Sequence, residues 1–455
     1  MKSSGQDVLE LLRRYESRNV TFIDPDGSWP IVWQRAKGVH VWDTQGNRYL
    51  DLTAAFGVAA TGHANPRVVR AGQKQMGQLL HAMGDVHPHP LKAALARELS
   101  RITFERWHGL KFKVQSSKFK VVPAGTRPGL RTDSTHGKTI FCNSGFEAVE
   151  AALKTAMLAT SRPGVIAFHG AYHGLGYGAL HVTHREHFRA ALKRQLGAWG
   201  FFVPFPNELR QLASLEKALY GLIRKREIGA ILVEPVQGRG GINVPPLEFL
   251  PLLRRMCDET HTLLICDEIY TGLGRTGRWF ACEHSGTVPD VVCLGKALTG
   301  GFPLSACVGR ADLMDEAWPP ASGEAIHTST YLGHPVGCAM ALAQIREIER
   351  GTLTKRSGQL GKVLERELKT LTIPRGLDGS IRGLGLMIGM ELRLSDGRPA
   401  KEICLALIRQ LLHRGFILLG EGEHSNVISF TPPLVISEDQ LIRTAAALKR
   451  CLAEL

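Results

Sequence analysis

The sequence lacks any long hydrophobic run. No stretch approaches the roughly 18–20 uninterrupted apolar residues that a membrane-spanning helix needs, so we expect no membrane span and no membrane partner. The first twenty residues are typical of a short amphipathic helix and contain no apolar core followed by a cleavage site, which argues against a secretory signal. Internal repeats and low-complexity tracts are also missing, which excludes repeat architectures.

Cysteine pairs of the C-x-x-C type are absent too. The nine cysteines are odd in number, and several lie within apolar runs, as Cys266 and Cys293 do. Buried, reduced thiols explain this pattern best, so we expect a cytoplasmic protein. His81, His87 and His89 fit no common zinc spacing and lie among prolines, which predicts a loop and no metal site.

The formal net charge of +14 raises the question of a nucleic-acid partner. Most basic residues are dispersed, and the densest basic stretch, 111–120, alternates its lysines as the solvated face of a hairpin would. We therefore expect no nucleic-acid partner, while the positive field suits an anionic cofactor and acidic substrates. Residues 108–138 are polar, basic and contain glycine and proline, and we interpret them as an insertion before the first strand of a large domain.

Short apolar runs alternate with helical stretches through the middle of the chain. Most runs are continuously apolar, as strands covered on both faces must be. The seven runs are 139–143, 165–170, 201–206, 230–236, 263–269, 291–296 and 305–310. Helical patterns at 146–159 and 247–260 fall between them. This alternation predicts an α/β domain with a mostly parallel sheet.

The two ends of the chain have a different pattern. From about residue 345, long helices mix with strands, which predicts a smaller α+β domain. Near the N-terminus, the segment 39–52 is typical of a hairpin with Gln45, Gly46 and Asn47 at its turn.

Polar residues end several of the apolar runs. Ligands of open α/β sheets bind beyond the carboxyl ends of the strands, and there the sequence has Glu234, Asp267, Lys296 and the turn Asn143-Ser144-Gly145. A lone carboxylate or lysine at such a place is more often a cap or a solvated group. Asp267 and Lys296 occur together, however, and each precedes a glycine-rich segment.

These two residue types suit one kind of chemistry. A lysine desolvated beside a bound cofactor has a lowered pKa and can form an imine with an aldehyde. A carboxylate under a pyridine ring keeps the ring nitrogen protonated and makes the ring an electron sink. The turn from Ser144 to Glu147 joins a strand to a helix, whose N-terminus favours a phosphate group, although such turns are common.

With these residues in place, the segment 263–306 resembles the signature of the class III pyridoxal-5′-phosphate (PLP) dependent aminotransferases, the ω-amino acid, ornithine and 4-aminobutyrate type. The segments NSGFEAVEAALK, FHGAYHG, EPVQGRGG, HTSTYLGHP and RGLGLMIGMEL are similar to further family blocks, in the family's order. The likeness runs from about Val41 to the C-terminus and leaves out 108–138.

The resemblance implies the type I PLP-dependent transferase fold. This is an α/β fold with a mostly parallel seven-stranded sheet in the large domain and a smaller α+β domain formed by both ends of the chain. The implied division assigns 1–60 to the small domain, 61–344 to the large PLP-binding domain and 345–455 to the C-terminal small domain.

The resemblance also implies roles for single residues. Lys296 would hold PLP and then move the proton during catalysis, and Asp267 would pair with the pyridinium nitrogen. The other implied cofactor contacts are Ser144, Gly145 and Phe146 at the phosphate, Ile269 and Tyr172 on the two ring faces, and His173 and Tyr270 nearby. Thr330 matches a threonine that reaches the phosphate from a neighbouring subunit, which implies a homodimer with shared active sites, or a tetramer.

The sequence departs from the family in the substrate pocket. Many members have a carboxylate-binding arginine where this chain has Ser429, and another where it has Leu175. Tyr270 replaces a common glutamine, and Phe56 is bulky and apolar at a substrate position. Without either arginine the pocket loses a bidentate carboxylate contact. Arg239 is a candidate replacement for this contact, but arginines in loops are mostly solvated, so we expect Arg239 to be solvated.

These departures argue against glutamate and 2-oxoglutarate as preferred substrates. We expect an enzyme that moves an amino group from an amine or ω-amino compound of apolar character to a keto acid or aldehyde acceptor, by a ping-pong mechanism. Glu234, no longer paired with an arginine, could accept a distal ammonium group. The alternatives are an aminomutase or decarboxylating relative of the same fold and, from another class, a non-catalytic binding protein or a basic nucleic-acid binder.

Overall fold

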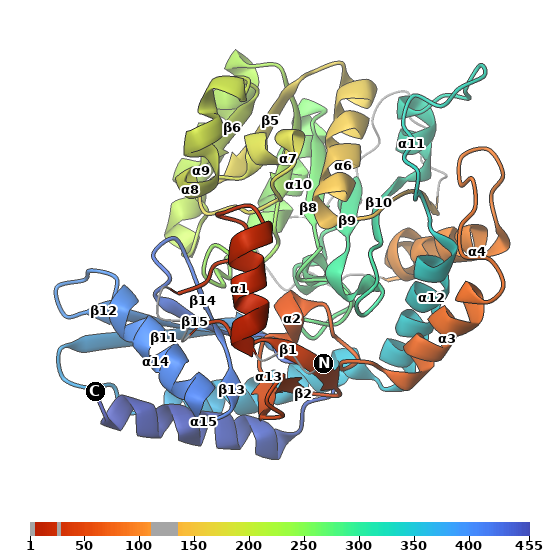
Figure 1. Ribbon diagram of the computed structural model, residues 1–455. Coiled ribbons are helices and arrows are strands. Elements are labelled where there is room, and N and C mark those ends of the chain that lie inside the picture. Colours follow the sequence, from red (N-terminus) through yellow and green to blue (C-terminus); the bar gives the residue numbers. More distant parts are fainter. Residues whose placement is uncertain (1–4, 25–28, 111–134) are drawn as a thin grey trace.

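The computed structural model describes residues 5–24, 29–110 and 135–455. Most of the predicted insertion at 108–138, with its basic stretch 111–120, lies outside the described residues. A large sheet with helices on both faces forms one part of the molecule, and two smaller sheets with their helices form another (Figure 1). In the described part of the chain, no helix is long and apolar enough to span a membrane.

The large sheet contains seven strands in the order β4-β10-β9-β8-β7-β5-β6. Its strands are β4 (Gly137–Cys142), β5 (Gly164–Phe168), β6 (Gly200–Val203), β7 (Ile228–Val233), β8 (Leu263–Asp267), β9 (Val291–Leu294) and β10 (Ser305–Arg310). They coincide with the seven apolar runs, so that prediction is confirmed. Only β10 runs antiparallel to its neighbours β4 and β9, while the other neighbouring strands of this sheet are parallel.

Helices cover both faces of this sheet, which explains why its strands are apolar throughout. In β7, Ala230 and Leu232 face a cluster that contains α6 (Gly145–Thr160), while Ile231 and Val233 face the cluster that contains α10 (Phe249–Thr260). Successive side chains of a strand point to opposite faces, so a strand between two layers needs apolar residues at every position. The sheet is therefore a central layer between helices.

Two four-stranded sheets lie beside the large one. The first has the order β1-β2-β3-β13 and the second the order β11-β12-β15-β14. Their bounds are β1 (Trp33–Lys37), β2 (His40–Asp43), β3 (Arg48–Asp51), β11 (Leu377–Leu384), β12 (Met387–Leu394), β13 (Phe416–Ile417), β14 (Leu419–Glu421) and β15 (Val427–Phe430). The predicted hairpin is β2 and β3, with Gln45, Gly46 and Asn47 between them.

The first of these sheets joins the two ends of the chain. β3 pairs in parallel with β13, so N-terminal strands and a C-terminal strand share one sheet. This pairing is compatible with the predicted division of the chain into domains, which stays a prediction. The predicted boundary between 344 and 345 falls inside α12 (Pro335–Arg350), a continuous helix.

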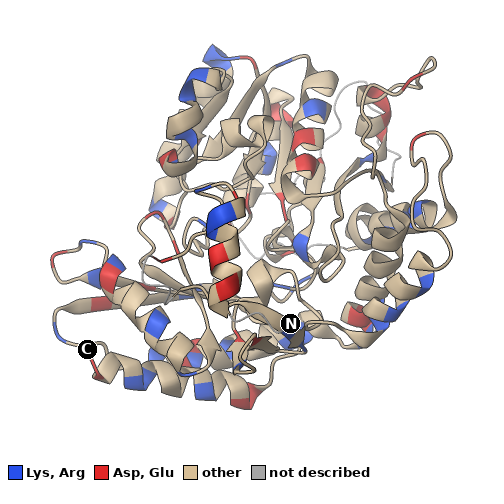
Figure 2. Ribbon diagram, viewed as in Figure 1, with Lys and Arg blue, Asp and Glu red and all other residues tan. Residues whose placement is uncertain are grey.

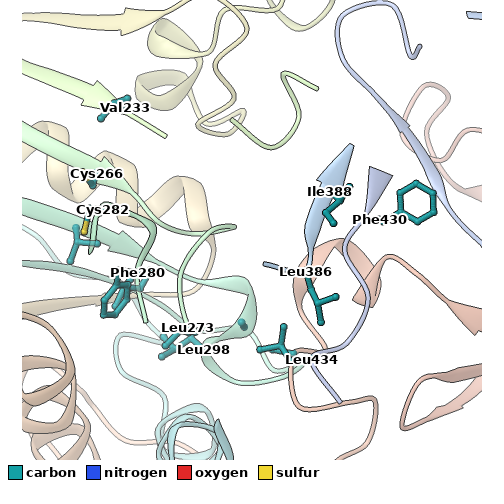
Figure 3. Close-up of a cluster of buried hydrophobic side chains, with 14 of the residues drawn as sticks. Val233, Cys266, Leu273, Phe280, Cys282, Leu298, Leu386, Ile388, Phe430 and Leu434 are labelled. Carbon is teal, nitrogen blue, oxygen red and sulfur yellow. The ribbon is translucent and has the colours of Figure 1, made fainter. Parts of the chain in front are cut away.

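One hydrophobic core connects the large sheet with the second small sheet. Figure 3 shows part of it, from Val233 and Cys266 at the ends of β7 and β8 to Ile388 in β12 and Phe430 in β15. All nine cysteines are buried and free, as the apolar runs around them predicted. The ends of β7 and β8 are linked to β12 and β15 through intervening side chains such as Leu273, Leu298 and Leu434, and close packing of this kind tolerates little relative movement.

The remaining helices surround these sheets. They are α1 (Gly5–Tyr15), α2 (Ala54–Gly57), α3 (Pro66–Met76), α4 (Pro90–Ser100), α5 (Arg106–Gly109), α7 (Tyr177–Val182), α8 (Glu186–Arg189), α9 (Leu212–Lys225), α11 (Ala311–Ala317), α13 (Leu353–Lys369), α14 (Lys401–His413) and α15 (Glu438–Ala453). α1 is the expected N-terminal amphipathic helix. His89 caps α4, where its ring accepts the amide proton of Lys92. Charges of both signs are interspersed over the helices (Figure 2).

Candidate active site

A cavity of about 370 Å³ lies where several strands of the large sheet end. It is lined by Gly145, Phe146, Tyr172, His173, Gly174, Leu175, Glu234, Arg239, Asp267, Ile269, Tyr270 and Lys296. The lining comes from the segments that follow β4, β5, β7, β8 and β9. The carboxyl ends of these strands meet at one edge of the sheet, as the ligand sites of open α/β sheets do.

Lys296 follows the short strand β9 directly after Gly295, in a left-handed backbone conformation with φ +34°. Its Nζ atom lies 4.2 Å from the centre of the Tyr270 ring. Burial lowers the pKa of Lys296, an effect that nearby Asp267 and Glu234 oppose. A buried amine whose pKa is lowered is less often protonated at neutral pH and can act as a nucleophile.

Asp267 ends β8 and is almost fully buried. Its Oδ2 atom lies 2.8 Å from Nδ1 of His173, and its Oδ1 atom accepts the amide proton of Ile269 at 3.1 Å. His173 is held in turn, because its amide donates to Oγ1 of Thr183 at 2.9 Å. Two contacts, one at each carboxylate oxygen, thus fix Asp267 in the cavity.

The turn between β4 and α6 provides an anion-binding element. The amides at the start of an α-helix have no partner within the helix and carry partial positive charge. Oγ of Ser305 donates to the carbonyl oxygen of Ser144 at 2.5 Å, which ties the turn to β10. The backbone of Gly145 approaches Ile269 so closely that a Cβ there would lie 3.1 Å from it. Glycine therefore suits this position.

The Tyr270 ring lies between two glycines. A Cβ at Gly57 would come within 2.5 Å of the ring and one at Gly238 within 2.4 Å, so neither position can carry a side chain without a shift. The Tyr270 hydroxyl is 3.0 Å from Oγ1 of Thr431. Burial raises the pKa of Tyr270 to about 12, so the hydroxyl stays protonated at neutral pH. Tyr270 therefore presents a neutral aromatic face to Lys296.

Glu234 follows β7 and anchors two walls of the cavity. Its Oε1 atom accepts the amide proton of Tyr172 and its Oε2 atom that of Gly238, both at 2.9 Å. Burial raises the pKa of Glu234 to about 7, against the effect of the nearby His173. At neutral pH this carboxyl group is therefore ionised only in part, and a cation placed beside it would favour the ionised form.

Phe56 belongs to a strained turn. The residues from Ala54 to Phe56 all have positive φ, a conformation that non-glycine residues rarely adopt. Asp51 holds this turn through its side chain, which accepts the amide protons of Thr53 at 2.8 Å and Ala55 at 3.2 Å. The Phe56 side chain is 46% exposed, and its ring lies 5.9 Å from the guanidinium carbon of Arg239.

The structure gathers most of the expected site residues but leaves some apart. Ser429 is buried in β15, where it pairs with Gly389 and Leu419, and it does not line the cavity. Ser144 lies next to the lining residue Gly145, with its Oγ atom buried and without a hydrogen-bond partner. Thr330 lies on an exposed segment outside the cavity of its own chain.

Arg239 corrects one expectation. The sequence favoured a solvated loop arginine, yet Arg239 lines the cavity and its Nε atom lies 3.4 Å from Oε2 of Glu421. Glu421 was missed altogether, because it ends the three-residue strand β14 in a polar, glycine-containing run that resembles an ordinary turn. Only the folded arrangement of β14 against the loop after β7 brings the two together.

The sequence is similar to known proteins over most of its length. The sequence profile of the family described as aminotransferase class-III matches residues 23–452. The chain is 36% identical over 434 residues to the 5-aminovalerate aminotransferase of Pseudomonas aeruginosa, covering 94% of each protein. It is 33% identical over 471 residues to the putrescine aminotransferase of Pectobacterium atrosepticum, covering 100% of this chain and 90% of that protein.

Solved structures are similar to this chain in fold. An amine transaminase from an uncultivated Pseudomonas species, in its PLP-bound form, superimposes with a TM-score of 0.82 at 26% identity, covering 97% of this chain and 98% of that one. The ornithine aminotransferase of Toxoplasma gondii gives a TM-score of 0.80 at 26% identity, covering 99% and 95%.

Proposed function

The chain belongs to the class III aminotransferases and is a PLP-dependent transaminase, and from this premise we propose that its amino donor is an ω-amino compound with a largely apolar chain. The observation that supports this most is the composition of the cavity. Lys296 and Asp267 line the cavity together with Tyr172, Leu175 and Phe146, which provide apolar surface. At two positions where many relatives have an arginine, this chain has Ser429 and Leu175.

The residues present fit the cofactor. Ser144 Oγ and His173 Nε2 are buried polar atoms without a hydrogen-bond partner in the structure, and both lie at or beside the cavity. Lys296 would hold PLP, Asp267 would face its ring nitrogen, and the turn at Gly145 would receive its phosphate. When bound, PLP supplies an aldehyde that condenses with amines and a pyridinium ring that withdraws electrons.

The chain's own groups would then carry out the remaining work. Lys296 would hold the cofactor, and its Nζ atom would serve as the general base and acid that moves the substrate proton. Asp267, held by His173 and the Ile269 amide, would keep the ring nitrogen protonated. The aromatic walls would exclude water from the reacting atoms. The same groups also serve aminomutases and decarboxylating enzymes, but the named relatives are aminotransferases and do not favour those alternatives.

A panel of donors and acceptors tests the substrate proposal. We expect ω-amino donors and apolar amines to exceed glutamate by at least about tenfold in kcat/KM, because the pocket lacks the usual arginine pair. Single-turnover spectra recorded with each donor and no acceptor give the rate of the half-reaction. Release of a ketone or aldehyde without release of CO₂ identifies that reaction as transamination. A diamine in the panel tests Glu234 as the acceptor of a distal ammonium. Glutamate as the best donor would contradict the proposal.

We also propose a homodimer with shared active sites. Several apolar side chains around Thr330 are exposed, and exposed apolar patches often mark interfaces. They are Leu79, Leu80, Met83, Val86, Ile326 and Tyr331. His81 and Tyr331 are in ring contact at 5.5 Å, so the segments that carry these residues lie side by side. Thr330 would reach the phosphate site of the second copy. The nine free, buried cysteines support a cytoplasmic location.

Mixing two variants tests the shared site. Lys296→Ala and Thr330→Ala are each expected to be impaired, the second mainly in PLP affinity. If sites are shared, random re-pairing of equal amounts leaves about a quarter of all sites with both residues intact. Activity at limiting PLP should rise accordingly after the variants are co-refolded. Ser329→Ala, which removes the neighbouring hydroxyl, serves as the control and should stay active alone. A mixture no more active than its separate components would contradict the shared site.

A further inference from the structure

A loosely joined ion pair borders the cavity. Arg239, in the loop after β7, and Glu421, at the end of β14, approach to 3.4 Å between Nε and Oε2. Glu421 is 2% exposed, whereas the Arg239 side chain is 31% exposed. Neither of these two atoms has a hydrogen-bond partner of good geometry in the structure. The pair is therefore an electrostatic contact whose hydrogen-bonding capacity is largely unused.

A nearby ion pair shows what a structural pair looks like in this fold. Arg382 donates to Glu391 at 2.6 Å, and it also donates to the carbonyl oxygens of Gly241 at 2.6 Å and Ile242 at 3.0 Å. In the described part of the chain, the Arg239 side chain makes no such hydrogen bond. A buried ion pair stabilises a protein only when its hydrogen bonds are satisfied. The Arg239 pair is thus poorly suited to a purely structural role.

Aromatic rings hold the Arg239 guanidinium at the cavity. Its central carbon lies 5.4 Å from the Tyr172 ring centre and 5.9 Å from that of Phe56. Ring faces attract a guanidinium without occupying its N–H donors. A guanidinium fork offers two parallel N–H groups that match a carboxylate. Arg239 therefore presents unused donors in the same cavity that Lys296 lines.

We propose that Arg239 binds the distal carboxylate of the substrate. When a substrate has no distal carboxylate, Glu421 neutralises Arg239, and in this way Glu421 sets the specificity. This inference rests on the proposed function and deepens it. An ω-amino acid would place its amino group at Lys296 and its carboxylate at Arg239. A purely apolar amine would leave the Arg239–Glu421 pair intact, so no unpaired charge would face its chain.

The electrostatics around Glu421 agree with this exchange. Burial raises the pKa of Glu421, while Arg239, Lys296 and Arg185 lower it. When a carboxylate takes Arg239, Glu421 loses its main cationic partner, and a raised pKa makes uptake of a proton easier. The buried carboxyl group then need not remain an unpaired anion. The cavity would thus have one charge state when it binds an ω-amino acid and another when it binds an apolar amine.

Binding of unreactive ligands to the holoenzyme tests the pair. Straight-chain carboxylates of four to eight carbons are compared with the corresponding primary amides, as inhibition constants and by spectral titration. Arg239→Gln should lower the preference for carboxylate over amide about 10- to 100-fold, the range of a charge-assisted hydrogen bond. Glu421→Gln should raise that preference about 3- to 10-fold, because the internal competitor is gone. Arg239→Gln with the wild-type preference would overturn the assignment.

Arg185→Gln is the matched control, since it removes a positive charge from the same cluster. The Arg185 guanidinium lies 5.5 Å from the Phe188 ring centre and is directed to the Glu423 carbonyl oxygen at 3.4 Å. We expect its preference for carboxylate to change less than about threefold. Arg239→Lys, which keeps the charge but loses the fork, should give an intermediate preference and guards against misfolding of the glutamine variant. An equal loss in Arg185→Gln would mean that overall charge, and not Arg239, selects carboxylates.

The same variants separate failure of this inference from failure of the proposed function. With an apolar amine that has no carboxylate, Arg239→Gln should lose a smaller factor in single-turnover kcat/KM than it loses with an ω-amino acid of the same chain length. With an ω-amino acid it should show a raised KM and a nearly unchanged kcat. If no donor reacts with the wild-type holoenzyme, the proposed function fails. If donors react but Arg239→Gln keeps its KM for ω-amino acids, only the assignment of the pair fails.

Discussion

Replacing Lys296 with alanine is expected to abolish amino-group transfer, with a loss of at least about 10⁴-fold in the single-turnover rate. Lys296 is the lysine that lines the cavity, and it lies against the Tyr270 ring close to Asp267. Burial lowers its pKa and so increases the fraction of neutral amine. Alanine can neither form a bond to the cofactor's aldehyde nor move a proton. Water cannot compensate for the loss of the bond to the aldehyde.

Two measurements define this result. Borohydride treatment of the wild-type holoenzyme followed by peptide mass mapping should find the cofactor attached at Lys296. Lys296→Arg keeps a positive charge but no condensing amine, so it should be as inactive as the alanine variant. Both variants should keep the wild-type melting temperature within a few degrees, which excludes unfolding as the cause. An alanine variant that retained a percent of the wild-type rate, or a label on another lysine, would show that Lys296 is not the cofactor lysine.

Replacing Asp267 with asparagine is expected to lower kcat by about 10²- to 10³-fold, the effect of removing one preorganised electrostatic partner from a buried site. Asparagine has nearly the same size, so the contact to His173 and the bond from the Ile269 amide can be kept. What is lost is the negative charge that would keep the cofactor's ring nitrogen protonated. Absorbance spectra over pH, which report protonation of the bound cofactor, should shift along with the rate.

Glu268 provides a control in the neighbouring position. It is as deeply buried as Asp267, but it accepts the amide protons of Ala281 at 3.0 Å and Cys282 at 2.8 Å and does not line the cavity. Glu268→Gln should therefore lower the melting temperature and leave kcat within a few-fold of wild type. If Asp267→Asn and Glu268→Gln had the same effects on rate and stability, Asp267 would be a structural residue and not a cofactor contact.

Much of the fold could be predicted because strong local patterns coincide with it. A strand buried on both faces must be apolar at every position, and the seven runs that obey this rule are the seven strands of the large sheet. The rule of ligand binding at the carboxyl ends of strands then selected Asp267, Lys296 and Glu234, all of which line the cavity. The antiparallel direction of β10 could not be predicted, since an apolar run has no direction.

Other features needed long-range information. His173 and Asp267 are 94 residues apart in the chain and touch only because β5 and β8 end at the same edge of the sheet. The parallel pairing of β3 with β13 likewise depends on the path of the whole chain. A short segment does not indicate which distant segment it contacts. Its residues satisfy the same local preferences whichever partner they pack against.

The Lys296 position, the turn after β4 and the order of the family's motifs were determined by the sequence alone, because the chemistry they imply depends on residue type and spacing along the chain. The surroundings of the substrate were decided by the tertiary structure. Arg239 resembled a solvated loop residue and Glu421 part of a polar turn, and packing joined them at the cavity. The physical reason is that burial and pairing change what a charged side chain can bind, and both arise only when distant segments pack together.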